Sequence, residues 1–319
     1  MNGVFLDRDS LGHDTHLKAF EKLPINWQHF PQTMPEETLA RLENIDIALT
    51  NKVIIKEEHF KQCPRLRYIG ILATGTNNVD LIAAKQYNVA VTNVVKYGTP
   101  SVVQHTFALI LNLSIHLQDY LSAIRNGEWQ KSPLFWLHAA PIRELKDLTL
   151  GIVGYGELGR GVAKMAQAFD MKVLIAQRAG NISQNDGVPR VPLNELLPQV
   201  DVLSLHCPLT PETRYLIDQQ ALSLMKPDAI LINTARGGLV DEEALATALR
   251  AGKLGGAAVD VLTEEPPKNG NPLLANDIPN LLITPHIAWA ARESRQRAID
   301  QAADNLGLFL NGNSQNRVA

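Results

Sequence analysis

Short apolar runs alternate with helical patterns along almost the whole chain. This alternation is typical of βαβ units, in which helices join parallel strands. In the first part of the chain it predicts strands at Gly3–Leu6, Ile45–Thr50, Tyr68–Leu72 and Val89–Thr92. Amphipathic helices are expected at Pro35–Leu42 and Asp80–Gln86, and a longer apolar helix is expected at Ser101–Asn126.

A second α/β series begins after Leu145. Its predicted strands are Leu148–Val153, Lys172–Ala176, Val202–His206, Ala229–Asn233, Ala257–Val261 and Leu281–Thr284. Six strands with helical crossovers match a doubly wound, dinucleotide-binding sheet. The last helix, Glu293–Leu310, has an apolar face, and such a helix often packs back on the first domain. The pattern therefore predicts two α/β domains, the first of them discontinuous in sequence.

Composition narrows the class of protein. The length of 319 residues favours two domains, and the net charge of -3 gives no reason to expect nucleic acid or an anionic membrane as partner. The sequence has no apolar run of transmembrane length and no secretory pattern at its N-terminus, so a cytoplasmic protein is expected. Cys63 and Cys207 lie far apart in no metal-ligand spacing, which predicts neither a metal site nor a disulfide.

One irregular stretch, Gly127–Arg143, carries the aromatic residues Trp129, Phe135 and Trp136. Aromatic side chains are enriched at subunit interfaces, so this arm is a candidate for a contact between subunits. A loop packed on its own domain explains the same residues, and the sequence leaves both interpretations open.

The segment GYGELG, residues 154–159, follows an apolar strand and opens an amphipathic helix. A GxGxxG pattern is weak alone, but this context is the one that dinucleotide binding requires. Gly154 would permit the tight turn, Gly156 would let the backbone approach a pyrophosphate, and Gly159 would let helix and strand pack closely. Amides at the helix N-terminus then face the anion, which predicts a dinucleotide site.

Gln177 and Arg178 stand where an acidic residue would hold the ribose hydroxyl of NAD. A carboxylate there would repel the 2′-phosphate of NADP, and Arg178 would pair with that phosphate. Alternatively, Arg178 points into solvent and Gln177 bonds the ribose. The cofactor is therefore NAD or NADP, with NADP or dual use slightly favoured.

Three late strands lead into charged or titratable residues. Arg236 follows the first, Asp260 with Glu264 and Glu265 the second, and His286 the third. In a parallel sheet these segments open at one edge, beside the glycine loop. Arginine binds carboxylates through its planar fork, and histidine exchanges protons near neutral pH. Each residue also has a structural explanation: Arg236 capping a helix or pairing with Asp241, Glu264 acting in place of Glu265, and His286 as a core histidine.

The segments GYGELG, NTARGGLVDEEAL, GAAVDVLTEEPP and LLITPHIAWA together resemble the D-isomer-specific 2-hydroxyacid dehydrogenase family, over essentially the whole chain. The resemblance implies Arg236 as substrate binder, Glu265 as the partner of the histidine and His286 as the acid/base. It implies a doubly wound Rossmann-type cofactor domain at 98–286. A smaller flavodoxin-like α/β substrate domain would comprise 1–97 and 287–319. It also implies a homodimer made largely by the cofactor domain.

The resemblance also assigns cofactor contacts, with Gln177 as the departure from the usual acid. They are Leu158, Gly159, Gln177, Cys207, Pro208, Thr213, Thr234, Ala235, Arg236 and Asp260. The predicted cofactor-binding set also includes Gly154, Gly156, Glu157, Arg178 and His286.

In the first domain, ILATGTNNVDL places Thr74 and Gly75 after a strand. The family's matching loop holds the substrate carboxylate, so these two residues join Arg236 and His286 as predicted substrate binders. The same stretch also fits a plain strand-to-helix turn. Weaker candidates for the site are Lys52, Tyr97, Gln104, Thr106 and Trp289.

Within the family, LATGTNNVDL and HIAWA are most similar to hydroxypyruvate reductases (glycerate dehydrogenases), which commonly also reduce glyoxylate. The expected activity is therefore NAD(P)-dependent reduction of a small 2-oxo acid to the D-2-hydroxy acid. Another 2-hydroxy acid is an alternative substrate. A nucleotide-sensing binding module is an alternative of another class, because fold alone does not settle function.

Overall fold

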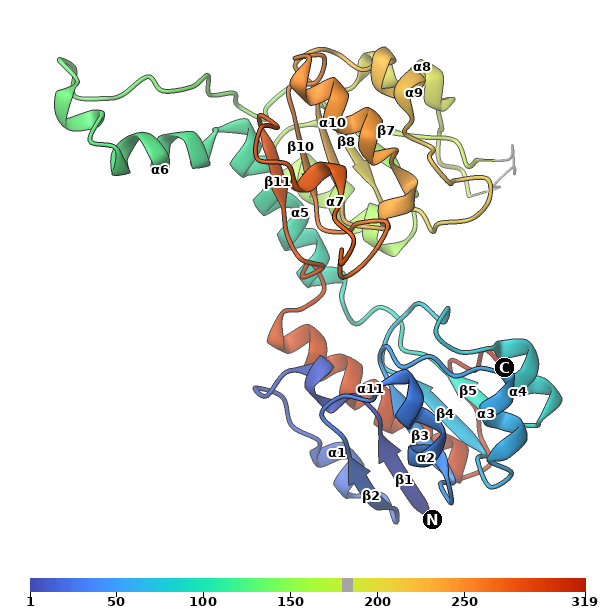
Figure 1. Ribbon diagram of the computed structural model, residues 1–319. Coiled ribbons are helices and arrows are strands. Elements are labelled where there is room, and N and C mark those ends of the chain that lie inside the picture. The colour runs from blue at the N-terminus through green and yellow to red at the C-terminus, as the bar shows by residue number, and fades with distance from the viewer. Residues whose placement is uncertain (180–185) are drawn as a thin grey trace. The chain divides into compact units, whose positions relative to one another are not determined.

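The computed structural model describes residues 1–179 and 186–319. The chain divides into two compact units, the first formed by Met1–Gly98 with Trp289–Ala319 and the second by Thr99–Ala288. Each unit contains one fully parallel sheet with helices packed on both of its faces (Figure 1). The predicted class, two parallel α/β sheets, is confirmed.

The sheet of the first unit has the strand order β2-β1-β3-β4-β5, which is the flavodoxin-like order. Its strands are β1 (Asn2–Phe5), β2 (Asn26–His29), β3 (Ile47–Thr50), β4 (Tyr68–Ile71) and β5 (Ala90–Thr92). Four of the five were predicted, with slightly longer ends. The sequence pattern missed β2 because this edge strand, NWQH, is mostly exposed and shows no apolar alternation.

Helices cover both faces of this first sheet. They are α1 (Lys18–Glu21), α2 (Thr38–Leu42), α3 (Glu57–Gln62), α4 (Leu81–Gln86) and α11 (Arg292–Leu310). Although α11 is the last helix of the chain, Figure 1 shows it lying along the sheet that begins the chain. Its residues Ala298, Ala302 and Leu306 are buried in one cluster with Phe5 and Leu49. The prediction that the last helix packs on the first sheet is confirmed.

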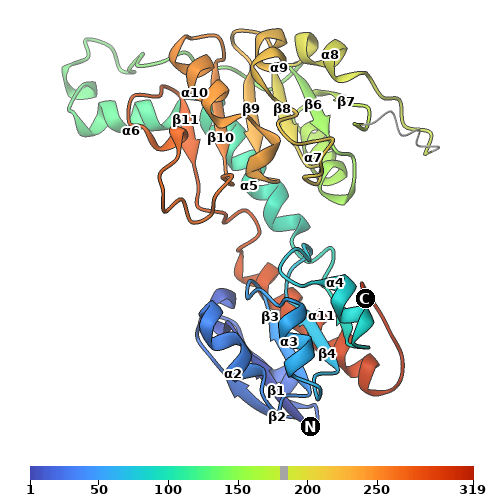
Figure 2. The same ribbon diagram turned by 45° about the vertical axis from the view of Figure 1, so that its right-hand side comes forward.

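The sheet of the second unit has the order β11-β10-β9-β8-β6-β7, seen as a continuous ladder in Figure 2. Its strands are β6 (Thr149–Val153), β7 (Lys172–Ile175), β8 (Val202–Leu205), β9 (Ile230–Asn233), β10 (Gly256–Val259) and β11 (Leu281–Ile283). All six predicted strands are present. The strand order reverses between β6 and β8, and such switch points are where doubly wound sheets bind ligands.

Alternate residues of these strands enter two separate cores. Leu203 and Leu231 pack on one face with helices α8 (Leu193–Leu196), α9 (Gln219–Leu224) and α10 (Glu242–Arg250). Val202 and Ile230 pack on the other with α5 (Thr99–Ser114) and α7 (Glu157–Ala168). Strands buried on both faces explain the nearly continuous apolar runs of the sequence. Short 3-10 helices occupy Arg8–Leu11, Pro35–Glu37, Trp129–Lys131, Leu197–Gln199, Gly237–Leu239 and Pro272–Leu274.

The long helix predicted at Ser101–Asn126 is wrong as a single element. It is broken into α5 and α6 (Leu117–Arg125), with His116 between them at a left-handed φ of 49°. Together these two helices have the length and apolar character of a membrane span, but they bend by 60° at the break. Among the described residues no single helix has that character.

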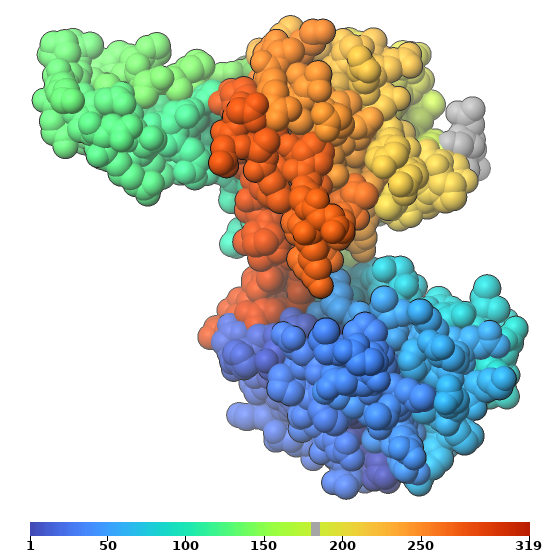
Figure 3. All heavy atoms as spheres, in the orientation of Figure 1, coloured from blue at the N-terminus to red at the C-terminus, as the bar shows by residue number. Residues whose placement is uncertain are grey.

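An arm formed by α6 and the following residues, 117–143, projects from the rest of the second unit (Figure 3). Its apolar side chains are exposed: Phe135 retains 91% of its accessible surface, and Trp129 and Trp136 about half. Trp129 Nε1 donates to the carbonyl of Phe135 at 3.1 Å, so the arm is held by its own contacts. Phe135 therefore does not pack on its own domain, whereas Trp129 and Trp136 are half-buried.

Candidate functional site

Five neighbouring strands of the second sheet end at the same level. In register, Val153 of β6 lies beside Leu205 of β8, which lies beside Asn233 of β9. Val259 of β10 lies beside that asparagine, and Ile283 of β11 is next. The residues that follow therefore leave the sheet along one edge, as the sequence predicted for parallel strands.

The glycine loop at this edge is packed so tightly that two of its glycines admit no side chain. A Cβ on Gly154 would lie 2.5 Å from the backbone nitrogen of Cys207, and its φ of 95° also favours glycine. A Cβ on Gly159 would lie 2.2 Å from the carbonyl oxygen of Gly154. A Cβ on Gly156, at the N-cap of α7, would meet nothing within 4 Å. The open space above Gly156 fits the pyrophosphate of a dinucleotide.

A cavity of about 210 Å³ lies beside the ends of β6 and β7. Gln177 and Arg178 line it together with the apolar residues Val153, Ala176 and Leu193. Both polar side chains are exposed, and neither forms a hydrogen bond or ion pair within the described part of the chain. Such a cavity, apolar with a polar rim, fits the adenosine half of a dinucleotide.

The segment after β8 borders the same edge at the switch point of the sheet. Burial raises the pKa of the Cys207 thiol to about 11, so this thiol stays protonated at neutral pH. Burial likewise lowers the pKa of the neighbouring His206 to about 4, and this ring is neutral. Thr213 donates to the carbonyl of Pro208 at 2.8 Å and thereby closes the loop. Cys207, Pro208 and Thr213 stay predicted cofactor contacts.

Arg236 follows β9 and is exposed, with its guanidinium donating to the carbonyl of Ala235 at 2.6 Å. In the described part of the chain it forms no salt bridge, and Asp241 instead caps α10 by accepting from Ala244 N. The alternative pairing of Arg236 with Asp241 is therefore wrong. The guanidinium is left with donors for an anionic ligand.

One of the small residues beside Arg236, Gly237, has a packing explanation. A Cβ on Gly237 would lie 2.0 Å from the carbonyl carbon of Leu262. The space beside this glycine is therefore occupied by the loop after β10, rather than left open for a ligand. The side chain of Asn233 shapes the same turn, since it donates to the carbonyl of Arg236 and accepts from Ala235 N.

His286 and Glu265 form the closest titratable pair at this edge. His286 Nδ1 lies 2.6 Å from Glu265 Oε2, and Glu265 Oε1 accepts from Leu262 N at 2.9 Å. Because an ionised carboxylate only accepts hydrogen bonds, Nδ1 carries a proton and Nε2 is the nitrogen available to a substrate. Glu264 instead accepts from Asn269 at 3.0 Å, so the alternative with Glu264 as the acid is wrong.

Asp260 is 1% exposed and follows β10 directly. Its carboxylate accepts from Thr284 Oγ1 at 2.5 Å and from the backbone nitrogens of Ile287 and Ala288 at 2.9 and 2.8 Å. The predicted role of Asp260 as a cofactor contact stays a prediction. The buried carboxylate of Asp260 therefore accepts hydrogen bonds from residues on either side of His286.

In the first unit, Thr74 and Gly75 follow β4 in a loop closed by polar contacts. Thr74 Oγ1 donates to the carbonyl of Val94 at 2.9 Å, and Asn93 donates to the carbonyl of Thr74 at 2.8 Å. Gly75 is half-buried with its backbone at the carboxyl edge of the sheet. The loop is thus fixed in shape, and its role as a carboxylate binder stays a prediction.

The weaker candidates take varied positions. Lys52 follows β3, and its backbone nitrogen donates to the carboxylate of Asp7. The rings of Tyr97 and Trp289 lie edge to face, with centroids 6.3 Å apart. Gln104 is exposed on α5, whereas Thr106 is fully buried, 3.3 Å from the hydroxyl of Thr234. Thr106 thus contacts the first residue after β9.

Sequence reasoning missed two residues of α5 that contact the segment carrying His286. His105 Nε2 lies 3.0 Å from Thr284 Oγ1, and Ser101 Oγ donates to the carbonyl of Ala288 at 2.6 Å. The available signal was their spacing: two polar residues four positions apart on a helix lie on one face, and polar groups that are buried there need polar partners.

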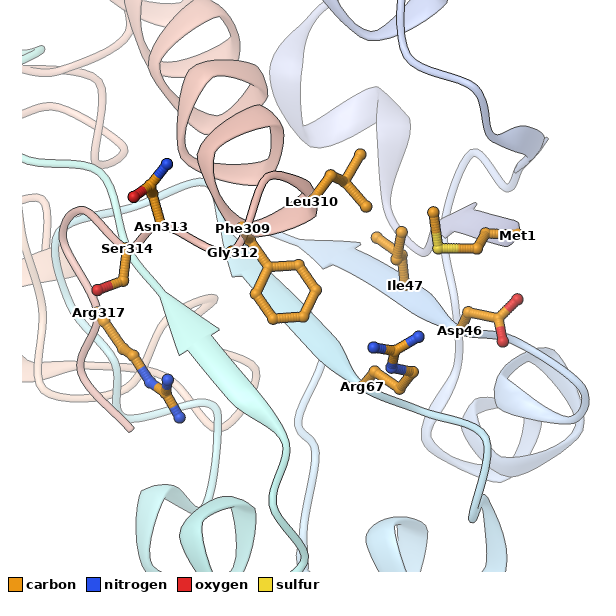
Figure 4. A pocket seen from close by; sticks show the side chains of 10 residues that line it. All are labelled: Met1, Asp46, Ile47, Arg67, Phe309, Leu310, Gly312, Asn313, Ser314 and Arg317. Atoms are coloured by element: carbon orange, nitrogen blue, oxygen red, sulfur yellow. The ribbon is translucent and has the colours of Figure 1, made fainter.

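The first unit contains a separate cavity of about 390 Å³ (Figure 4). Asp46 and Arg67, which directly precede β3 and β4, line it together with Phe309 and Arg317. This cavity therefore lies where the strands begin, and none of the predicted substrate residues lines it.

A doubly wound sheet that brings a glycine loop and a paired histidine to one edge defines a dinucleotide-dependent oxidoreductase. Residues 107–288 match the family described as D-isomer specific 2-hydroxyacid dehydrogenase, NAD binding domain. The protein belongs to the D-isomer specific 2-hydroxyacid dehydrogenase family. A nicotinamide cofactor is part of that assignment.

Similar proteins cover nearly the whole chain. A glycerate dehydrogenase of Methylorubrum extorquens is 44% identical, covering 99% of this chain and 98% of its own. A hydroxypyruvate reductase of Blautia hydrogenotrophica is 41% identical over 89% and 88%, respectively. Among solved structures, an acyclic imino acid reductase in complex with NADPH and D-Arg is 28% identical, with a TM-score of 0.85 and 100% coverage of both chains.

Proposed function

We propose that the protein reduces hydroxypyruvate to D-glycerate, and glyoxylate to glycolate as a second reaction, with a nicotinamide cofactor. The observation that carries the proposal is the 2.6 Å pair of His286 and Glu265, at the sheet edge that also bears the glycine loop. The choice of hydroxypyruvate rests on the glycerate dehydrogenase and hydroxypyruvate reductase relatives. Glyoxylate rests on the family resemblance of the sequence.

The cofactor is assigned to the second unit. The amides at the N-terminus of α7 would bind its pyrophosphate above Gly156, and the cavity beside Gln177 would hold its adenosine half. Glu157 and Leu158 begin α7 there, and Thr234, Ala235 and Asp260 are assigned to the nicotinamide half. When bound, the nicotinamide supplies the hydride for reduction.

The remaining chemistry is assigned to side chains of this protein. Arg236 would bind the carboxylate and neighbouring carbonyl oxygen through its fork, and Thr74 and Gly75 are proposed as further carboxylate ligands. His286 would donate its Nε2 proton to the carbonyl oxygen, which becomes the hydroxyl. Glu265 holds the ring through Nδ1 and stabilises the protonated imidazole by its charge.

NADP, or dual use of both cofactors, is favoured by the residues after β7. Gln177 and Arg178 line the cavity, and none of its described lining residues is a carboxylate that would repel a 2′-phosphate. The guanidinium of Arg178 is exposed and would pair with that phosphate. We expect kcat/KM with NADPH to equal or exceed that with NADH.

We also propose a homodimer. The exposed aromatic residues of the arm, Trp129, Phe135 and Trp136, form a surface that water does not solvate favourably. A second copy of this chain, presenting the same surface, would cover it around a two-fold axis.

The proposed reaction is tested by steady-state oxidation of NADH and NADPH with hydroxypyruvate, glyoxylate and pyruvate. We expect kcat/KM for hydroxypyruvate to exceed that for pyruvate by about tenfold or more, because a substrate hydroxyl that is bound adds discrimination. His286→Gln should lower kcat by roughly 10²–10⁴-fold. The control is His13→Gln at an exposed histidine of the first unit, which should leave kcat unchanged.

Two results would overturn the proposal. The first is a preference for pyruvate over hydroxypyruvate with either cofactor, which would point to another 2-hydroxy acid. The second is His286→Gln turning over as fast as the native protein. A preference for NADH over NADPH of about tenfold or more would contradict the cofactor assignment alone, because Arg178 would then contribute nothing to binding.

A further inference from the structure

His286 has a backbone conformation that a residue with a side chain rarely adopts. Its φ is 56°, in the left-handed region, where the Cβ crowds the backbone and costs free energy. Such a conformation persists only where surrounding contacts impose it. The orientation of the imidazole therefore depends on whatever holds residues 284–288.

The buried carboxylate of Asp260 is the first of these contacts. It accepts from Thr284 Oγ1, Ile287 N and Ala288 N, while its own backbone carbonyl accepts from His286 N at 2.7 Å. These contacts bracket His286 on both sides. A carboxylate that is 1% exposed also needs such donors to offset its lost hydration.

Helix α5 provides the second set of contacts. Ser101 and His105 are one turn apart on its surface, and they reach Ala288 and Thr284, which are likewise four positions apart. Helix α5 thus contacts both ends of the segment that carries His286. Neither α5 residue has a role in the reaction proposed above.

The direction of the hydrogen bonds follows from the carboxylate. Asp260 only accepts, so the hydroxyl proton of Thr284 points to Asp260 Oδ1 at 2.5 Å. The oxygen of that hydroxyl is then an acceptor, and His105 Nε2, 3.0 Å away, must be the donor. The same nitrogen lies 3.5 Å from Asp260 Oδ1. His105, Thr284 and Asp260 therefore form one ordered chain of hydrogen bonds.

We propose that His105 is a positioning residue: through Thr284 and Asp260 it fixes the strained backbone of His286 and so the aim of its imidazole. The inference rests on the proposed function, because it gives His286 the acid/base role. His105 itself touches neither reactant, so its loss should change the chemical step more than binding.

The test compares His105→Leu, which removes the donor, with His105→Gln, whose amide N–H has a similar reach. We expect His105→Leu to lower kcat for hydroxypyruvate by roughly 10–100-fold. KM and the Kd for NADPH should change by fewer fold than kcat, since His105 itself is assigned no contact with substrate or cofactor. His105→Gln should recover kcat to within about threefold.

A second measurement does not depend on turnover. Backbone amide hydrogen exchange of residues 284–290 reports the contacts to Ile287 and Ala288 directly. Exchange there should accelerate in His105→Leu and return to the native rate in His105→Gln. This readout separates the two proposals: a native protein without turnover of any 2-oxo acid would contradict the proposed function, while the exchange result would still decide the role of His105.

Thr284→Val completes a double-mutant cycle. Because His105 acts through Thr284, the double variant His105→Leu/Thr284→Val should lose no more kcat than the worse single variant. Native kcat and native exchange in His105→Leu would overturn the inference. Multiplicative losses in the double variant would also overturn it. If His105→Leu does not fold, His105→Gln decides: native kcat and exchange support the inference, and a large kcat loss in this folded donor variant contradicts it.

Discussion

Two adjacent carboxylates after β10 have different partners, although the sequence presents them as near equivalents. Glu265 reaches His286 at 2.6 Å, whereas Glu264 bonds Asn269. Both side chains are exposed, so the two residues differ in where their carboxylates point rather than in burial. Only one of them is therefore expected to affect proton transfer.

We predict that Glu265→Gln lowers kcat/KM for hydroxypyruvate reduction by roughly 10²-fold, within the range that positioned proton transfer supplies. The amide keeps a hydrogen-bonding group of the same shape but loses the charge that stabilises the protonated imidazole. Glu264→Gln is the matched control and should stay within about twofold of native. Equal losses in both variants would contradict the assignment of Glu265.

At the scale of the element, the glycines of the second unit serve two different purposes. Gly237 must be small because the loop after β10 passes against it, with Leu262 where a Cβ would be. Gly156 has open space instead, at the start of α7. A packing requirement and a ligand requirement are thus separable by experiment.

We predict that Gly237→Ala lowers the free energy of unfolding by about 1–3 kcal/mol, the usual cost of overpacking. Gly156→Ala should leave that free energy nearly unchanged but weaken NADPH binding by about tenfold or more, because its methyl group would occupy the pyrophosphate position. Denaturant unfolding and fluorescence titration measure the two effects.

Gly307 in α11 provides the control, since its Cβ would make only an ordinary contact of 3.8 Å with Leu23. Gly307→Ala should raise the free energy of unfolding by about 0.5–1 kcal/mol through reduced backbone entropy, without changing NADPH affinity. Unaltered NADPH binding in Gly156→Ala would show that the open space at α7 is not the pyrophosphate site.

At the scale of the whole molecule, the arm is the feature that a monomer does not explain. Phe135 retains 91% of its surface, and Trp129 and Trp136 lie in the same projection. Several exposed aromatic side chains in one segment cost solvation free energy unless a partner covers them.

We predict that the native protein is a dimer by light scattering and that Phe135→Asp/Trp136→Asp shifts it to monomer, because two charges would be desolvated at the interface. The control is Ile82→Asp, a charge placed at a residue 75% exposed on α4, outside the arm. A native monomer, or a double variant that stays dimeric, would contradict the assignment of the arm as the interface.

Most strands and the chemistry at their ends could be predicted from local patterns in the sequence. Burial on both faces makes a strand apolar along its length, so β6, β8, β9 and β10 were predicted from apolar runs that end in loops with charged or polar residues. The GxGxxG motif, Arg236 and His286 could also be found in the sequence, because each is defined by its position directly after an apolar strand. The edge strand β2 was missed because it buries almost nothing.

Which of these residues come into contact depends on how the strands and helices pack. Strand register, set by pairing between segments remote in sequence, brought Asn233, Val259 and Ile283 level. Packing chose Glu265 over Glu264 and brought His105 of α5 to Thr284, 179 positions away. A local pattern records whether a side chain is buried, but a contact depends on which buried surfaces adjoin, and that is fixed only when the sheets and helices pack.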